Sequence, residues 1–258
     1  MSVTFVGLGL NDEKGLTLEG LEEARNAEAV FAEFYTNLMP SLDRENLEHL
    51  LGKKIVALGR TQLEDEGARE IIKVAQTKKV VFLVPGDPMI ATTHISVRLE
   101  LSKRGIPSRI VHAPSIASAV CGATGLQSYK FGKSITLPRE PGVPQSLLET
   151  IQDNKKRGLH TLLLFDVRPS ELKQLTIEVA VQKLVGSESL LEDWTGIAAA
   201  RIGSPDQFLL CGRLRMLEQK KFGNVPHCLV FPGRLHFMEV EALKAFCGAT
   251  DEDLEGLK

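Results

Sequence analysis

The chain has 258 residues, of which 43% are hydrophobic and 25% charged, as is usual for a folded globular protein. This length can bury a large core and form two domains without a disulfide or a structural metal. The formal net charge is −2, and the short lysine clusters are dispersed along the chain. Binding to nucleic acid requires a concentrated positive surface, so this balance argues against a nucleic-acid partner.

Four cysteines are present, and none has CxxC spacing or a histidine at zinc-ligand distance. Free thiols in a reducing compartment are therefore expected, with no metal site. No apolar run approaches the roughly 18 residues that a membrane span requires. The first residues form a strand-like segment and lack the basic and apolar regions of a signal peptide. We expect a soluble, cytoplasmic protein that does not bind membranes.

In the first half, short apolar runs alternate with helical patterns from the N-terminus onward. Strands are predicted at residues 3–8, 29–32, 54–57, 80–84 and 109–111, and helices at 17–27 and 94–103. The run 80–84 is apolar throughout, which is typical of parallel strands that are covered on both faces. The strand–helix–strand order predicts a parallel, doubly wound sheet.

The pattern changes near Gly132, where a loop containing three prolines (138–144) follows. Further strands are predicted at residues 161–165, 196–201, 208–212 and 227–231, and helices at 145–157, 176–185 and 239–246. The prediction is therefore two α/β domains, residues 1–129 and 130–258.

Two glycines, Gly7 and Gly9, follow the first strand and invite comparison with dinucleotide-binding turns. The Rossmann fingerprint has a third glycine where this chain has Asp12, and its helix opens at once, whereas Lys14 and Gly15 intervene here. A nicotinamide or flavin site is therefore disfavoured. Two interpretations stay open: a tight turn that permits close backbone approach, or a ligand without phosphates packed on that backbone.

The segment Pro85-Gly86-Asp87-Pro88 ends the most apolar strand. Ligands of open α/β sheets bind beyond the carboxyl ends of strands, so Asp87 is a candidate site residue, although a structural Asx-turn explains it as well. The following Thr92-Thr93-His94 fits a helix N-cap better than a catalytic role. The small residues from Pro114 to Ala119 fit either backbone N–H groups open to a ligand or tight helix packing.

Three histidines, His160, His227 and His236, lack the spacing of metal ligands or catalytic triads and are interpreted as structural. No GxSxG, HExxH, P-loop or paired-carboxylate pattern occurs, which excludes the hydrolases that carry these signatures. The residues alone thus predict a two-domain α/β enzyme that binds a ligand.

Seven segments also resemble the archaeal diphthine synthases, in that family's order and spacing. They are Phe5–Glu13, Val30–Met39, Val84–His94, Val111–Ala119, Thr124–Ser134, Arg157–Val167 and Pro226–Leu243. Within them, the blocks AEFYT, PGDP-ATTH and YKFGKS are more specific to this family than a pair of glycines is. The wider class is tetrapyrrole methylase-like, which implies two α/β domains with a cofactor cleft between them. Members that act on tetrapyrroles carry GxGPG after the first strand, whereas GLGLN here favours the diphthine branch.

The resemblance implies that the cofactor is S-adenosyl-L-methionine, with S-adenosyl-L-homocysteine as product. The residues that it implies as cofactor contacts are Leu10, Asp87, Ile90, Ser115, Ile116, Phe165, Ile202 and His227. No catalytic residue is assigned, because proximity and orientation can supply most of the barrier reduction for methyl transfer. Asp87 either holds the cofactor or receives a proton.

The implied acceptor is the amino group of a 3-carboxy-3-aminopropyl histidine on translation elongation factor 2, a step of diphthamide biosynthesis. The archaeal likeness implies three transfers to nitrogen by a homodimeric enzyme. The alternatives are a methyltransferase of the same superfamily acting on a corrinoid or porphyrin precursor, a nicotinamide oxidoreductase that uses Gly7 and Gly9, and a binding module without activity.

Overall fold

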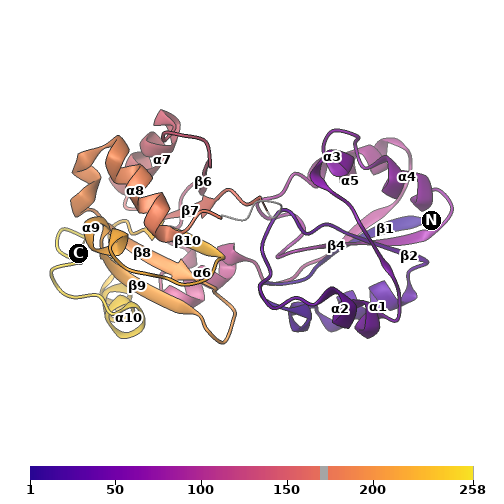
Figure 1. Ribbon diagram of the computed structural model, residues 1–258, viewed down its shortest axis with the longest axis horizontal. Coiled ribbons are helices and arrows are strands. Elements are labelled where there is room, and N and C mark those ends of the chain that lie inside the picture. Colours follow the sequence, from indigo (N-terminus) through magenta and orange to yellow (C-terminus); the bar gives the residue numbers. More distant parts are fainter. Residues whose placement is uncertain (169–173, 258) are drawn as a thin grey trace. The chain divides into compact units, whose positions relative to one another are not determined.

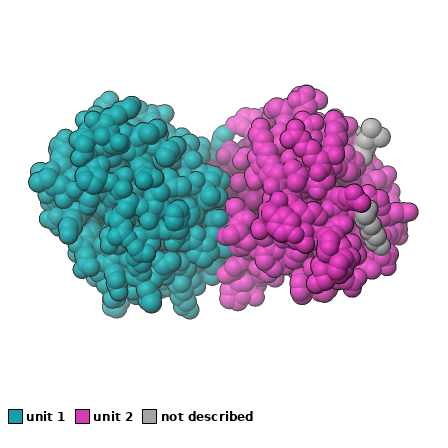
Figure 2. Space-filling model, turned by 180° about the vertical axis from the view of Figure 1, so that it is seen from behind, with its two compact units in different colours: residues 1–116, 168–170 teal, residues 117–167, 171–258 magenta. Residues whose placement is uncertain are grey.

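A computed structural model describes residues 1–168 and 174–257, which divide into two compact units (Figure 2). The first unit comprises Met1–Ile116 with Arg168, and the second comprises Ala117–Val167 and residues 174–257. Compact units need not coincide with evolutionary domains, so the sequence-based boundary between residues 129 and 130 stays a prediction.

The first unit contains one parallel five-stranded sheet in the order β3-β2-β4-β1-β5. Helices α1 and α2 cover one face, and α3, α4 and α5 cover the other (Figure 1). The parallel, doubly wound sheet predicted from the sequence is confirmed. Its elements are β1 (Ser2–Gly7), η1 (Glu13–Gly15), α1 (Leu18–Asn26), β2 (Ala29–Ala32), α2 (Arg44–Leu51), β3 (Ile55–Ala57), α3 (Arg60–Leu63), α4 (Arg69–Ala75), β4 (Lys79–Val84), α5 (Ile95–Lys103) and β5 (Ser108–Val111).

Local capping explains where the helices on the first face begin and end. The Thr17 hydroxyl accepts a hydrogen bond from the Gly20 N–H at 3.0 Å, so Thr17 caps α1. Helix α2 was not predicted. Asp43 caps its N-terminus by accepting from the N–H groups of Glu45 and Asn46, and Gly52 ends it in the left-handed conformation.

The second unit contains a mixed five-stranded sheet in the order β6-β7-β10-β8-β9, in which only β6 and β7 are parallel. Helices α7, α8 and α9 share one hydrophobic core with these strands. The remaining elements of the chain are α6 (Ile116–Thr124), η2 (Ser128–Lys130), β6 (Ile135–Leu137), α7 (Gln145–Lys156), β7 (Thr161–Phe165), α8 (Ile177–Ser187), η3 (Ser189–Asp193), β8 (Thr195–Ala200), β9 (Phe208–Arg213), α9 (Leu214–Glu218), β10 (His227–Phe231) and α10 (Phe237–Cys247).

A buried carboxylate, Glu239 of α10, ties α10 to η2 and to the start of β7. It accepts hydrogen bonds from His160 Nε2 at 2.9 Å, from the Lys130 ammonium, and from the N–H groups of Gln127 and His236. Burial by itself raises the pKa of Glu239, but these hydrogen bonds outweigh it and lower the pKa to about 2. Because His160 Nδ1 also accepts from the Gly233 N–H, this histidine is structural, as predicted.

All four cysteines are free thiols; Cys211, Cys228 and Cys247 are buried, and Cys121 is partly exposed. Of the helices that the structure describes, none combines the length and apolarity needed to cross a membrane.

Candidate functional site

The carboxyl ends of β1, β4 and β5 meet at one edge of the first sheet. After β1 the chain enters α1 on one face, and after the adjacent β4 it enters α5 on the other. Such a point, where neighbouring strands send their helices to opposite faces, is where open α/β sheets bind ligands. The structure brings to this edge all the candidate residues of the first unit, which are Leu10, Asp87, Ile90, Ser115 and Ile116.

Two glycines let the surrounding loops close over the end of β1. A Cβ atom on Gly7 would lie 2.5 Å from Gly86 O and 2.6 Å from Ala113 Cβ, so no other residue fits without displacing a loop. Gly9 has a φ of +79° and pairs with Gly86 through two backbone hydrogen bonds of 3.2 and 2.7 Å. The interpretation of Gly7 and Gly9 as residues that permit close backbone approach is confirmed.

The Asp87 side chain is buried at this edge and makes contacts in two directions. Oδ1 accepts a hydrogen bond from the Met89 N–H at 3.0 Å, which is the structural turn that the sequence allowed. Oδ2 lies 2.7 Å from Nδ1 of His112 and also accepts from the Ala113 N–H at 3.4 Å. Asp87 is therefore both a turn residue and the partner of an exposed imidazole.

His112 is the site residue that the sequence analysis missed. It directly follows β5, and its side chain is 70% exposed. Asp87 follows β4 after Pro85 and Gly86, and β4 and β5 flank β1. A polar residue just beyond the end of each flanking strand was the signal in the sequence, but it could be read only once the strand order was known.

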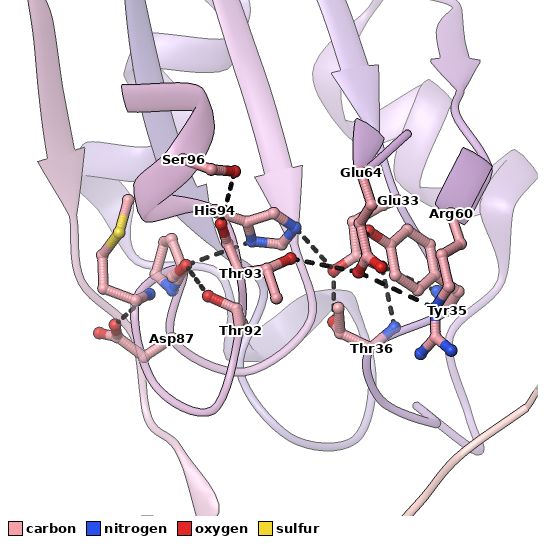
Figure 3. A network of polar contacts seen from close by, with 12 residues as sticks. Glu33, Tyr35, Thr36, Arg60, Glu64, Asp87, Thr92, Thr93, His94 and Ser96 are labelled. Carbon is pink, nitrogen blue, oxygen red and sulfur yellow. Dashed lines mark hydrogen bonds and ion pairs between the residues drawn. The ribbon is translucent and has the colours of Figure 1, made fainter. Parts of the chain in front are cut away.

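The loop between β4 and α5 is held from within by hydrogen bonds that the side chains of Thr92 and His94 make (Figure 3). The Thr92 hydroxyl donates to Pro88 O at 2.8 Å, and His94 Nδ1 donates to the same oxygen at 3.3 Å. His94 occupies the N-cap position of α5, as expected, but its side chain makes no capping hydrogen bond. The ring instead fixes the loop that carries Asp87 and Ile90.

Behind this loop lies Glu33, a fully buried carboxylate at the end of β2. It accepts hydrogen bonds from the N–H groups of Tyr35 and Thr36, at 2.7 and 3.0 Å, and from the Thr36 hydroxyl. Its Oε1 faces His94 Nε2 (Figure 3). Burial raises the pKa of Glu33 and lowers the pKa of His94 to about 4. The AEFYT and PGDP-ATTH blocks are thus parts of one buried network.

The second unit gathers its candidate residues, Phe165, Ile202 and His227, at one edge of its sheet. Phe165 ends β7, Ile202 lies just beyond the end of β8, and His227 begins β10. Because β10 runs antiparallel to both β7 and β8, its start lies beside their ends, and His227 pairs with Ala200. All three side chains are largely buried, with exposures of 6–8%.

His227 has a structural role, as the sequence analysis predicted. Its Nδ1 accepts from the Ile177 N–H at 3.2 Å at the start of α8, and its Nε2 donates to Asn224 O at 2.9 Å. Burial lowers the pKa of His227, in keeping with this neutral tautomer. Since both ring nitrogens are already bonded, a ligand at His227 would contact its ring carbons or its backbone. His236 is also structural, because it caps α10.

Arg201 links the loops that hold Ile202 and His227. Its backbone adopts a φ of +51°, which is uncommon for a residue with a side chain. Its guanidinium donates to the carbonyls of Phe222 and Asn224, at 2.6 Å each. These bonds fix the chain immediately before Ile202 to the chain that leads into β10.

Comparison with known proteins identifies the family to which this chain is similar. Residues 2–217 match the family Tetrapyrrole (Corrin/Porphyrin) Methylases. The chain is 41% identical to the diphthine synthase of Archaeoglobus fulgidus over 252 residues, which cover 97% of each chain. It is 43% identical to the diphthine synthase of Methanocaldococcus jannaschii over 253 residues, which cover 94% of this chain and 98% of that one.

The fold agrees with these likenesses. A crystal structure of diphthine synthase superposes with a TM-score of 0.92 at 41% identity and covers 100% of both chains. The predicted tetrapyrrole methylase-like class is confirmed. The protein belongs to the tetrapyrrole methylase family and, within it, to the diphthine synthases, which are methyltransferases.

Proposed function

We propose that this enzyme transfers methyl groups from S-adenosylmethionine to the amino group of a 3-carboxy-3-aminopropyl histidine on translation elongation factor 2. The observation that carries the proposal is the continuous likeness to diphthine synthases, at 41–43% identity over nearly the whole chain. The aligned region covers the loops at both strand edges. Function has to be argued from such sites, because ligands of open α/β sheets bind beyond the carboxyl ends of the strands.

The residues at these edges fit the chemistry of S-adenosylmethionine. This ligand carries cationic groups and hydroxyls but no phosphate, and the first edge offers the buried Asp87 carboxylate and no phosphate-binding fingerprint. Next to Leu10, the buried Oδ1 of Asn11 has no hydrogen-bond partner among the described residues. The proposed contacts are Leu10, Asp87, Ile90, Ser115, Ile116, Phe165, Ile202 and His227.

S-adenosylmethionine, when bound, supplies a methyl group activated on a sulfonium. The protein orients the acceptor, excludes water and holds the loops in place. In the second unit, the apolar side chains of Phe165 and Ile202 lie at one sheet edge and offer few hydrogen-bonding groups. The proposal includes three transfers to nitrogen, a homodimer, and a cytoplasmic location alongside the elongation factor.

The test is the intact mass of elongation factor 2 that carries the aminocarboxypropyl histidine, after incubation with this protein and S-adenosylmethionine. A ladder of three methyl increments is expected, and none is expected when the modified histidine is replaced. If the mass stays unchanged while S-adenosylmethionine still binds, the acceptor assignment is wrong and a corrinoid or porphyrin precursor becomes the substrate to examine.

A further inference from the structure

We infer that His112, oriented by Asp87, is the catalytic base that removes the proton from the acceptor amine. The inference rests on the proposed function, because that function defines the acceptor. The geometry at the edge of the first sheet supports it independently. His112 Nδ1 lies 2.7 Å from a buried carboxylate oxygen of Asp87, while the imidazole itself is mostly exposed.

The partners of Asp87 determine which nitrogen of His112 carries the proton. An ionised carboxylate only accepts hydrogen bonds, so Nδ1 of His112 must be the donor, and Nε2 is left with a free lone pair. Nε2 makes no hydrogen bond to any residue that the structure describes. A carboxylate on one nitrogen and a free lone pair on the other is the arrangement of a histidine that acts as a general base.

The backbone around Gly7 makes the pair rigid. Asp87 is fixed by the N–H groups of Met89 and Ala113, and the loops that carry Asp87 and His112 close over Gly7, where no Cβ atom fits. The imidazole is therefore held at the strand edge, three residues before Ser115 and in contact with Asp87, two of the proposed cofactor residues.

Methylation of an amine requires such a base. Aliphatic amines are protonated near neutral pH, and an ammonium has no lone pair with which to attack a methyl group. In each transfer, one proton passes from the nitrogen to Nε2 of His112 and then to water. The nitrogen lone pair then forms the bond to the methyl carbon, the carbon–sulfur bond breaks, and its electron pair goes to sulfur. Three such cycles convert the ammonium into a trimethylammonium group and release three protons.

Two other titratable groups of the network behind this edge are closed to an acceptor. Glu33 and His94 are 0% and 1% exposed, and His94 already uses Nδ1 on Pro88 O. Asp87 is buried and turned toward His112. Asp87 is also the charged group that the structure places within ion-pair distance of His112.

The kinetic test compares His112→Gln with wild type in single-turnover transfer to elongation factor 2, from mildly acidic to alkaline pH. The variant is expected to lose about 10²-fold in rate near neutral pH, and the loss should shrink at alkaline pH, where solvent deprotonates the amine. Its affinity for S-adenosylmethionine, measured by calorimetry, should not change. The matched control is His49→Gln, an exposed histidine on α2, which should behave as wild type.

A loss of rate that is equal at every pH would overturn the inference and leave His112 a structural residue, as would a wild-type rate in His112→Gln. If wild type itself does not methylate the elongation factor, the proposed function fails. A second measurement then still tests the pair: nitrogen NMR of the ligand-free protein should show His112 protonated on Nδ1, and Asp87→Asn should abolish that preference. A proton on Nε2 in wild type would contradict the inference.

Discussion

His94 Nε2 lies 3.9 Å from Oε1 of Glu33, and both side chains are excluded from solvent. This distance is too long for a hydrogen bond, so Nε2 is a buried nitrogen without a partner among the described residues. Burial favours the neutral form of both groups: it raises the pKa of Glu33 and lowers the pKa of His94. The pair joins the end of β2 to the loop that carries Asp87, and its protonation therefore bears on the stability of the candidate site.

Replacing Glu33 tests whether its carboxylate stabilises the fold through the hydrogen bonds that its oxygens accept or through its charge. Glu33→Ala leaves the partly buried N–H groups of Tyr35 and Thr36 without an acceptor, which is expected to lower the free energy of unfolding by about 2–4 kcal/mol. Glu33→Gln keeps an oxygen for these donors and should lose less than about half as much. Urea denaturation of both variants and wild type provides the measurement. An equal loss in the two variants would contradict this account.

The stability of the first unit should respond to acid through His94. Its pKa is lowered in the folded protein from 6.5 to about 4, so the stabilisation is complete above pH 6.5 and is lost as the pH falls toward 4. A shift of this size corresponds to a loss of roughly 3 kcal/mol in the free energy of unfolding between these two pH values. His94→Gln, which does not titrate, should therefore show a flatter dependence of unfolding free energy on pH across this range. Parallel pH profiles for wild type and variant would show that His94 does not titrate on unfolding.

The sequence predicted best the features that depend on short stretches of chain. The apolar run 80–84 and the strand 161–165 agree with β4 and β7 within one residue, because continuous burial leaves a local signature. Helix α2 escaped prediction because its buried stripe consists of only a few residues, although Asp43 and Gly52 marked both of its ends.

Features that depend on pairing between distant segments could not be predicted in this way. The antiparallel neighbours of β10 place His227 beside Phe165 and Ile202, but strand direction has no local signature. The contact between Asp87 and His112 likewise requires that β4 and β5 flank β1. The sequence therefore indicated strand ends as the candidate site without revealing which side chains meet there.

The buried cluster around Glu239 should be a main determinant of the stability of the second unit. Glu239→Gln removes the charge that faces the partly exposed Lys130 ammonium and weakens its hydrogen bond to a charged group, which is expected to cost about 1.5–3 kcal/mol. Glu241→Gln, an exposed change on the same helix, is the control and should change stability by less than about 0.5 kcal/mol. Chemical denaturation followed by circular dichroism distinguishes them, and similar midpoints would refute the assignment.

Gly7 should tolerate no side chain, because the loops after β4 and β5 occupy the space. In Gly7→Ala the new methyl group would meet Gly86 O and Ala113 Cβ at about 2.5 Å, so the loops must separate. Overpacking of this kind is expected to cost about 1–3 kcal/mol and to weaken the contact between Asp87 and His112. Gly122→Ala in α6 is the matched control: nothing lies within 4 Å of its added Cβ, and alanine favours a helix by about 0.5–1 kcal/mol. Thermal unfolding should therefore shift in opposite directions for the two variants. A Gly7→Ala protein as stable as wild type would show that the loops are not closed over β1.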